Sequence, residues 1–188
     1  ATGSMIVDIG GGTTEIAVMS LGGVVYSKSL RVAGDAMDAA IISYMRKKFN
    51  LLIGESTAEK IKKEIGTAIP TSNNIFLMKG RDIRTGTPKE ISLTEEDACE
   101  ALMPILSQMM AAIKEALENT PPELSADLVD MGLVLTGGGA LLKNIDKLIS
   151  KDTGLPVTIA DNPLECVALG TGKALENEEL FSTMLSEY

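Results

Sequence analysis

Two glycine-rich strings in this sequence could hold a phosphate-bearing ligand. Residues 8–14 read DIGGGTT and residues 135–140 read LTGGGA, and each string follows a short apolar run. Residues without a Cβ let backbone N–H groups approach a ligand closely and adopt positive φ, which suits phosphate oxygens. We predict that the first string is a turn between two strands. The second should join a strand to a helix, whose N-terminus favours anionic groups.

Side chains beside the first string could complete such a site. Asp8 would end an interior strand, where a carboxylate can hold Mg²⁺ through water. The hydroxyls of Thr13 and Thr14 could orient a water or contact a terminal phosphate. The spacing of a Walker loop is absent. The alternatives are a tight hairpin in which Asp8 only caps the loop, and helix–sheet packing at the second string. The two strings together favour a nucleotide held along strand ends.

The composition excludes several kinds of function. Histidine is absent from all 188 residues, which rules out a Ser-His-Asp triad, a Cys-His dyad and a His metal site. The formal net charge of -9 repels nucleic acid and anionic membrane faces. Cys99 and Cys166 stand far apart among apolar neighbours, which indicates free thiols in a reducing compartment. No apolar run approaches the roughly 20 residues that span a bilayer, so we expect a cytoplasmic protein.

The elements that must position these strings follow from hydrophobic periodicity and turn residues. The expected strands are residues 5–7, 14–19, 21–30 with a turn at Gly22-Gly23, a short strand near 75–78 within the polar segment 70–88, 131–136 and 157–159. The expected helices are residues 35–50, 56–65, 95–119 with a kink at Pro104, 140–150 and 165–175, followed by a frayed acidic tail from 176. Residues 123–129 are expected to form one more helix or a turn. This order predicts an α/β sheet with one strongly helical insertion. The first residues look like a cut through a longer protein.

At this point the sequence resembles the superfamily of actin, heat-shock-70 proteins and sugar kinases, and within it the MreB family of bacterial actin homologues. The matching strings cover nearly the whole chain and are residues 7–15, 50–55, 59–66, 120–124 and 135–142. The resemblance implies an α/β, ribonuclease-H-like actin-fold subdomain made of residues 1–34 and 93–188. Residues 35–92 would form a smaller inserted α+β subdomain.

The resemblance also implies a site for ATP or ADP with Mg²⁺. Its cofactor-binding residues would be Gly10, Gly11, Gly12, Thr13, Glu59, Lys62, Gly137, Gly138, Gly139 and Ala140. Gly11, Gly12 and Thr13 would contact the phosphates, and Glu59 and Lys62 would reach the adenosine. Gly138, Gly139 and Ala140 would line the base and ribose. Thr13 would help set up hydrolysis, and Asp8 would reach Mg²⁺ through water.

Some of these residues have plainer interpretations. Without the resemblance, Glu59 and Lys62 would be interpreted as a solvated helix face. Asp35 and Asp38 are expected to cap the following helix.

The implied function is that of one half of a filament protein that organises cell-wall synthesis and maintains rod shape at the inner face of the membrane. ATP would lie between two lobes and control polymerisation. The partners would be other copies of the protein and a RodZ-like membrane protein, which would dock on the subdomain formed by the chain ends. The family's first phosphate turn, its catalytic glutamate and its membrane-inserting elements do not occur in this sequence.

What this chain does by itself therefore stays open, including whether it is an enzyme. We expect it to bind ATP weakly, not to hydrolyse it, to be a monomer and to make no direct membrane contact. The alternatives are a partner-docking module and a superfamily kinase, which would need an aspartate base for a substrate hydroxyl. No spare aspartate in such a context is visible.

Overall fold

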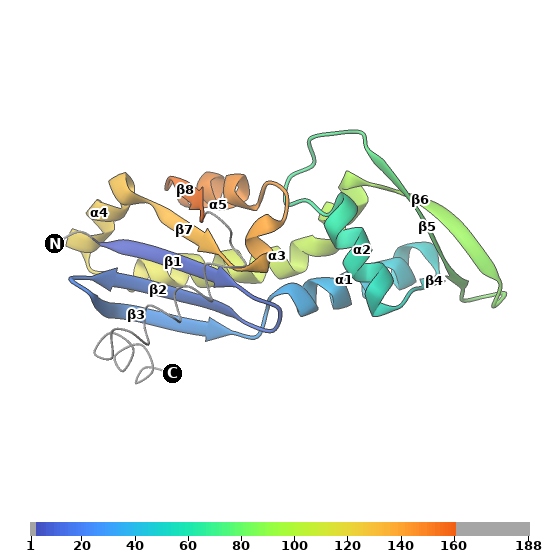
Figure 1. The fold of residues 1–188 in the computed structure, drawn as a ribbon, viewed down its shortest axis with the longest axis horizontal. Coiled ribbons are helices and arrows are strands. Elements are labelled where there is room, and N and C mark those ends of the chain that lie inside the picture. Colours follow the sequence, from blue (N-terminus) through green and yellow to red (C-terminus); the bar gives the residue numbers. More distant parts are fainter. Residues whose placement is uncertain (1–2, 161–188) are drawn as a thin grey trace.

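The computed structural model of this chain describes residues 3–160, which form two sheets joined by helices (Figure 1). The larger sheet has five strands in the order β3-β2-β1-β7-β8. Its strands are β1 (Ser4–Ile9), β2 (Thr14–Ser20), β3 (Gly23–Leu30), β7 (Leu133–Thr136) and β8 (Val157–Ile159). The first three are antiparallel, whereas β7 and β8 run parallel to β1. The three early strands predicted from the sequence are confirmed.

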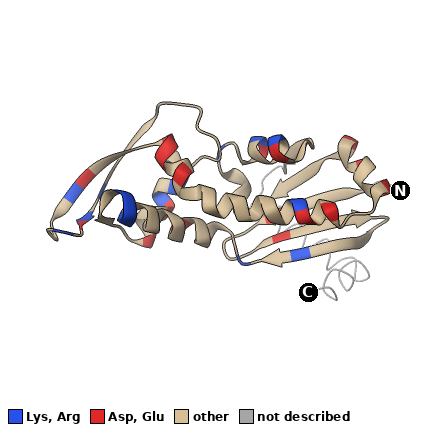
Figure 2. Cartoon of the chain, turned by 180° about the vertical axis from the view of Figure 1, so that it is seen from behind, with Lys and Arg blue, Asp and Glu red and all other residues tan. Residues whose placement is uncertain are grey.

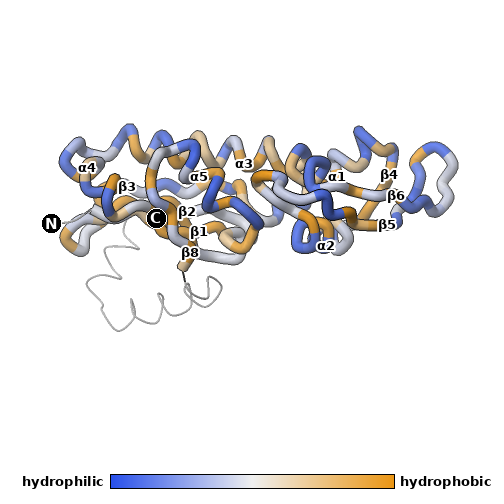
Figure 3. Tube along the Cα trace, turned by 90° about the horizontal axis from the view of Figure 1, so that it is seen from above, coloured by the Kyte–Doolittle hydropathy of each residue, from blue (hydrophilic) through white to orange (hydrophobic). Residues whose placement is uncertain are grey.

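The larger sheet is buried on the face that carries Met5, Val7 and Ile9 of β1 together with Ile16 and Val18 of β2. Helix α3 (Glu95–Glu118) packs against β2 and β3. Figure 3 shows hydrophobic and hydrophilic residues alternating along this helix, as expected for an amphipathic element. Burial of one face of each element against the other therefore builds a continuous core.

Helix α3 begins and continues as its sequence dictates. Thr94 and Asp97 form a capping box in which each side chain accepts the other residue's backbone N–H. The helix runs unbroken through Pro104 to Glu118, and the Gln108 side chain donates to the Pro104 carbonyl at 3.3 Å. The long helix expected from the sequence is confirmed.

The segment between β3 and α3, which we call the inserted unit, contains the smaller sheet and lies at one end of the molecule (Figure 1). It consists of α1 (Gly34–Phe49), β4 (Leu51–Leu52), α2 (Glu55–Ile65), β5 (Ile75–Asp82) and β6 (Pro88–Thr94). The sheet order is β4-β5-β6. Met37, Ile41 and Met45 of α1 are buried, as are Ala58 and Ile61 of α2. Both helices predicted here are confirmed, and together they anchor the small sheet to the rest of the chain.

Sequence pattern alone misses β4 and β6. The sequence predicts no strand over residues 88–94, which lie between the polar segment 70–88 and the helix expected from residue 95, and most of their side chains are exposed in the structure. Strand β6 forms because β5 offers it a complete ladder of backbone partners from Ile75 to Arg81. Asp82 closes the hairpin by accepting the N–H groups of Arg84 and Thr85.

The segment after the second glycine string also differs from expectation. A four-residue 3₁₀ turn, η1 (Gly138–Leu141), follows β7, and α5 (Ile145–Thr153) starts only at residue 145. The helix expected at 140–150 is therefore wrong at its start. Leu142 is extended and Asn144 adopts φ +64, and both interrupt the helical path. The second string therefore does not open directly onto a full helix.

The remaining expectations concern short elements and the chain end. Residues 123–129, expected to form a helix or a turn, lie in helix α4 (Pro122–Met131). The β2–β3 turn has positive φ at Leu21 and Gly22 rather than at Gly22 and Gly23. The helix expected at 165–175 and the acidic tail lie outside the described residues. Within residues 3–160, no helix combines the length and the apolar content needed to cross a membrane.

Candidate functional site

The two glycine strings lie side by side at one edge of the larger sheet. Strands β1 and β7 are parallel neighbours with Asp8 opposite Thr136, so the chain leaves both strands at the same end. The first string forms a hairpin turn in which the Gly10 N–H donates to the Thr13 carbonyl at 2.9 Å. One ligand could therefore contact both turns.

The second turn packs directly against the end of β1. Gly137 has φ +82, and a Cβ on it would collide with Asp8 Oδ1 and the Ile9 carbonyl. A Cβ on Gly139 would collide with the Ile9 side chain. Glycine is required at these two positions by the close approach of the strands and, at Gly137, also by the backbone conformation.

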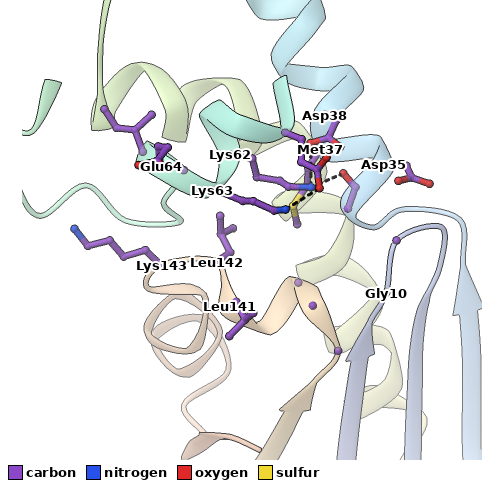
Figure 4. Close-up of a pocket in the computed structure, with 18 of the residues that line it drawn as sticks. Gly10, Asp35, Met37, Asp38, Lys62, Lys63, Glu64, Leu141, Leu142 and Lys143 are labelled. Carbon is purple, nitrogen blue, oxygen red and sulfur yellow. Dashed lines mark hydrogen bonds and ion pairs between the residues drawn. The ribbon is translucent and has the colours of Figure 1, made fainter. Parts of the chain in front are cut away.

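A cleft of about 1090 Å³ opens between these turns and the inserted unit. Figure 4 shows Gly10 and Asp35 on one side of it, Leu142 and Lys143 on the other, and Lys62 projecting from α2. The predicted site residues that line this cleft are Asp8, Gly10, Gly11, Glu59, Lys62, Gly137, Gly138 and Gly139. The fold therefore brings together residues that lie up to 131 positions apart in the sequence, Asp8 and Gly139.

Three of the predicted site residues do not line the cleft. Gly12 and Thr13 are exposed at the tip of the first turn and are not among the residues that line the cleft. Ala140 is fully buried behind the second turn, and it is likewise not a lining residue. Thr14 has a structural role, because its buried hydroxyl donates to the Val32 carbonyl at 2.6 Å. Of the two threonines, only Thr13 faces solvent beside the site.

Asp8 carries a carboxylate without a full set of partners. Its Oδ1 atom is buried and has no hydrogen-bond partner in the protein. Burial raises the pKa of Asp8, and the nearby Glu15 carboxylate raises it further. A cation on this oxygen would relieve both effects, whereas a water would supply only the missing hydrogen bond. Among the described residues no group of three or more His, Cys, Asp or Glu side chains could hold a metal, so Mg²⁺ here would need water and ligand oxygens as well.

Lys62 ties the inserted unit to the first turn. Its ammonium pairs with Asp38 at 2.9 Å and donates to the Gly34 carbonyl at 3.2 Å. The Gly34 N–H in turn donates to the Gly10 carbonyl at 3.0 Å. The Lys62 side chain is only 18% exposed, so this end of α2 is not a simple solvated face.

Glu59 has the surroundings of an ordinary helix surface. It pairs with Lys63 at 2.9 Å and its side chain is 50% exposed. The hydrogen bond from Lys63 lowers the pKa of Glu59. Neither Asp35 nor Asp38 caps α1, because the N-cap residue is Ala33 and no side chain bonds there. The expectation of a capping role was wrong, and Asp38 serves instead as the partner of Lys62.

Sequence comparison shows what kind of protein has this cleft. Residues 1–183 match the family model described as MreB/Mbl protein. This chain belongs to the MreB/Mbl family. It is 53% identical over 177 residues to the cell shape-determining protein MreB of Escherichia coli, and 50% identical over 177 residues to the cell shape-determining protein Mbl of Bacillus cereus. Each match covers 94% of this chain but only 51% and 53% of the relative.

Solved structures agree with the family assignment. MreB 5 of Spiroplasma citri bound to AMPPNP superposes with a TM-score of 0.90 at 41% identity, covering 95% of this chain and 54% of that one. The MamK double helical filament gives a TM-score of 0.72 at 21% identity, covering 86% and 50%. The latter likeness establishes the actin-type fold only. The chain thus spans about half the length of the relatives that it matches.

Several residues that line the cleft were not singled out from the sequence. Gly34, Glu95 and Lys143 reach it from three separate segments. The sequence pattern places Glu95 only at the start of the helix expected at 95–119, and Lys143 only within the helix expected at 140–150. No short-range pattern marks either of them, because the cleft wall that they share forms only when the inserted unit returns to the larger sheet.

Proposed function

We propose that this chain supplies one wall of an ATP-binding cleft in an actin-like filament protein that helps to determine cell shape. The observation that carries the proposal is the meeting of the two glycine turns at the ends of parallel strands β1 and β7. The matched relatives are named cell shape-determining proteins. Spiroplasma citri MreB 5 has been solved with AMPPNP and with ADP, which supports a nucleotide as the ligand.

The proposed arrangement assigns each part of the nucleotide to one part of the cleft. The phosphates contact Gly10, Gly11 and the exposed tip with Gly12 and Thr13, and the adenosine lies between α2 and the turn at residues 137–140. Asp8 holds the hydrated Mg²⁺, which supplies positive charge beside the phosphates when it is bound. Thr13 positions a water for hydrolysis when the opposite wall of the site is present.

The proposed units are a ribonuclease-H-like unit of residues 1–34 and 93–188 and an inserted unit of residues 35–92. The cleft lies between them, so ATP would contact both. Binding at this position would make the relative orientation of the units depend on the nucleotide.

Titration of the chain with Mg²⁺-ATP in a calorimeter tests the site. We expect saturable binding with an affinity weaker than micromolar and no ATP turnover, because the cleft contributes contacts from one wall only. Lys62→Met should abolish binding, because it removes the cation held between Asp38 and the first turn. Lys60→Met is the matched control on the exposed side of α2 and should leave binding unchanged.

Two results would contradict these expectations. Micromolar affinity, or turnover that Thr13→Ala abolishes, would show that the chain holds a complete site. No binding at millimolar Mg²⁺-ATP would contradict the nucleotide cleft itself.

The filament part of the proposal is supported by the two ends of the molecule. At one end, β5 presents Ile75 and Leu77, which are 64% and 61% exposed, beside Lys79 and Arg81 on the same face. Lys79 lies 3.9 Å from Glu90 of β6, and Figure 2 shows both basic and acidic residues in this unit. At the opposite end of the long axis lies α4 (Figure 1).

The surface of α4 complements that of β5. Val129 and Met131 of α4 are 61% and 57% exposed, and they stand beside the exposed acidic residues Glu123 and Asp130. One end is thus apolar and basic and the other apolar and acidic, which suits head-to-tail contact between copies.

A single charge at the acidic end should weaken this contact. In a chimera in which this chain replaces the matching part of the Escherichia coli relative, we expect Val129→Lys to raise the critical concentration for pelleting with ATP about tenfold. The substitution removes an apolar side chain that the proposed contact would bury, and it places a new cation opposite a basic surface. Met103→Lys on α3 is the control and should pellet like the parent chimera. Equal pelleting of all three proteins would rule out α4 as the contact.

Contact with a RodZ-like membrane partner, which would place the filament at the inner face of the membrane, is also part of the proposal. Part of the surface concerned, residues 161–188, lies outside the described residues.

A further inference from the structure

Glu95 is a buried carboxylate at the point where three segments meet. Its side chain is 2% exposed, and it lies at the start of α3. It accepts hydrogen bonds from the Ser72 hydroxyl, the Thr71 N–H and the Lys143 ammonium, which lies 3.1 and 3.3 Å from its two oxygens. The Ser72 hydrogen bond is the largest cause that lowers the pKa of Glu95. The carboxylate is therefore ionised at neutral pH and needs its cation.

The backbone beside Lys143 is joined to the inserted unit as well. The Lys143 carbonyl accepts the Ala68 N–H at 2.8 Å and the Thr67 hydroxyl at 3.2 Å. The Asn144 side chain donates to the Ile69 carbonyl at 2.8 Å. Thr67 is fully buried. The segment after α2 is thus bonded to the loop that follows the second glycine turn.

This junction forms a wall of the cleft. Glu95 and Lys143 both line it, together with Gly66 and Leu142. Figure 4 shows Lys143 and Leu142 on the side of the cleft away from Gly10 and Asp35. The Lys62 contacts join the two units on the Gly10 side. On the opposite side Glu95 joins them, because it bonds both Lys143 and residues 71 and 72 of the inserted unit.

We propose that Glu95 and Lys143 are a pair of positioning residues that hold the second glycine turn at a fixed place relative to the inserted unit. The pair acts through the backbone of residues 138–144 and does not itself need to touch a ligand. That this turn binds nucleotide rests on the proposed function, whereas the positioning itself does not.

The charges of the pair explain why it would hold the second glycine turn in place and not merely fill space. A buried carboxylate that loses its cation is left with an uncompensated charge, so the surrounding segments move to hydrate it. The hydrogen bonds of Thr67, Ala68 and Ile69 with residues 143 and 144 hold the surrounding segments together at the backbone. The ion pair adds a charged contact at the side of this junction that faces the cleft, so its loss should loosen the turn.

Residue-specific amide hydrogen exchange in the nucleotide-free chain tests the positioning. In Lys143→Met we expect the amides of Ala68, Ala140 and Leu142 to exchange about ten- to hundredfold faster. A hydrogen bond to a charged group is worth that much in a local opening equilibrium. The Gly34 amide, on the other side of the cleft, should not change. Lys147→Met on the exposed face of α5 is the matched control and should exchange like the wild type.

Two further variants separate positioning from general destabilisation. Lys143→Arg keeps the ion pair and should restore slow exchange at the same amides. Glu95→Gln combined with Lys143→Met should be no worse than Lys143→Met alone, because residues that act as a pair are not additive. Faster exchange at all amides alike, or exchange in Lys143→Met equal to that in Lys147→Met, would overturn the proposal.

A second readout connects the pair to the ligand. If nucleotide binds as proposed, Lys143→Met should weaken Mg²⁺-ATP binding about tenfold and Lys143→Arg should not. If no nucleotide binds to any variant while the exchange result holds, the proposed function fails and the positioning pair stands. If the affinity falls without a change in exchange, Lys143 contacts the ligand directly and the positioning role is overturned.

Discussion

Gly137→Ala is expected to lower the free energy of unfolding by about 2–6 kcal/mol and to abolish nucleotide binding. Gly137 has φ +82, a conformation that costs a side-chain-bearing residue about 1–3 kcal/mol. The new Cβ would also collide with Asp8 Oδ1 and the Ile9 carbonyl. Overpacking of a tight contact adds about 1–3 kcal/mol. The two effects add because the backbone at the end of β1 cannot move away without breaking its ladder with β7.

Urea unfolding followed by circular dichroism measures this loss. Gly12→Ala is the matched control, because a Cβ at Gly12 would meet no atom within 4 Å and its φ lies outside the positive region. Its stability should stay within about 0.5 kcal/mol of the wild type, as for most surface substitutions. A Gly137→Ala protein as stable as Gly12→Ala would mean that the two turns are not packed as the structure shows.

Asp8→Asn is expected to weaken the effect of Mg²⁺ on ATP binding about 10- to 100-fold. An outer-sphere carboxylate typically contributes that much to the affinity for a metal ion. The same substitution should stabilise the protein by about 1 kcal/mol at neutral pH, because it removes a charge from this site. Functional sites commonly retain groups that lower stability in this way. The introduced amide would keep the shape of the Asp8 side chain but carry no charge into the half-buried site beside Glu15.

The gain in stability from Asp8→Asn should depend on pH. The pKa of Asp8 is raised in the folded protein, so the folded state holds this proton more tightly than the unfolded state. The contribution of Asp8 to stability therefore falls as pH rises from the unfolded pKa through the folded one. The advantage of Asp8→Asn should be present at neutral pH and disappear below the unfolded pKa. Glu15→Gln is a useful comparison, since it removes only the smaller cause. An Asp8→Asn protein that is less stable than the wild type at neutral pH would contradict the assignment.

Much of the fold could be predicted from local pattern. The alternation of apolar residues in β1 and β2 and the helical spacing in α1, α2 and α3 identified these elements because each buries one regular face. Strand β6 could not be found in this way. Its ladder with β5 is made by backbone groups, while its side chains are mostly exposed and polar.

Some residues of the candidate site could be predicted from the sequence, and others could not. The glycine strings and Asp8 could be singled out because a run of residues without Cβ after a strand has few other uses. Asp38, Glu95 and Lys143 could not, because their roles depend on partners in other elements. Asp38 pairs with Lys62 of α2, and Glu95 bonds both Ser72 and Lys143. Helix capping by Asp35 and Asp38 was a reasonable local expectation, but Ala33 occupies the cap position.

The sequence by itself determined the positions of the two glycine turns and the apolar faces of the main helices and strands. It also excluded histidine chemistry. These properties depend on residue type and on neighbours within a few positions. Only the tertiary structure decided that the two glycine turns share one cleft and that Asp8 Oδ1 lies buried without a partner. It also decided that Glu95 meets Lys143 across 48 positions of sequence. The physical reason is that burial and pairing of charges depend on the packing of distant segments, which periodicity along the chain does not encode.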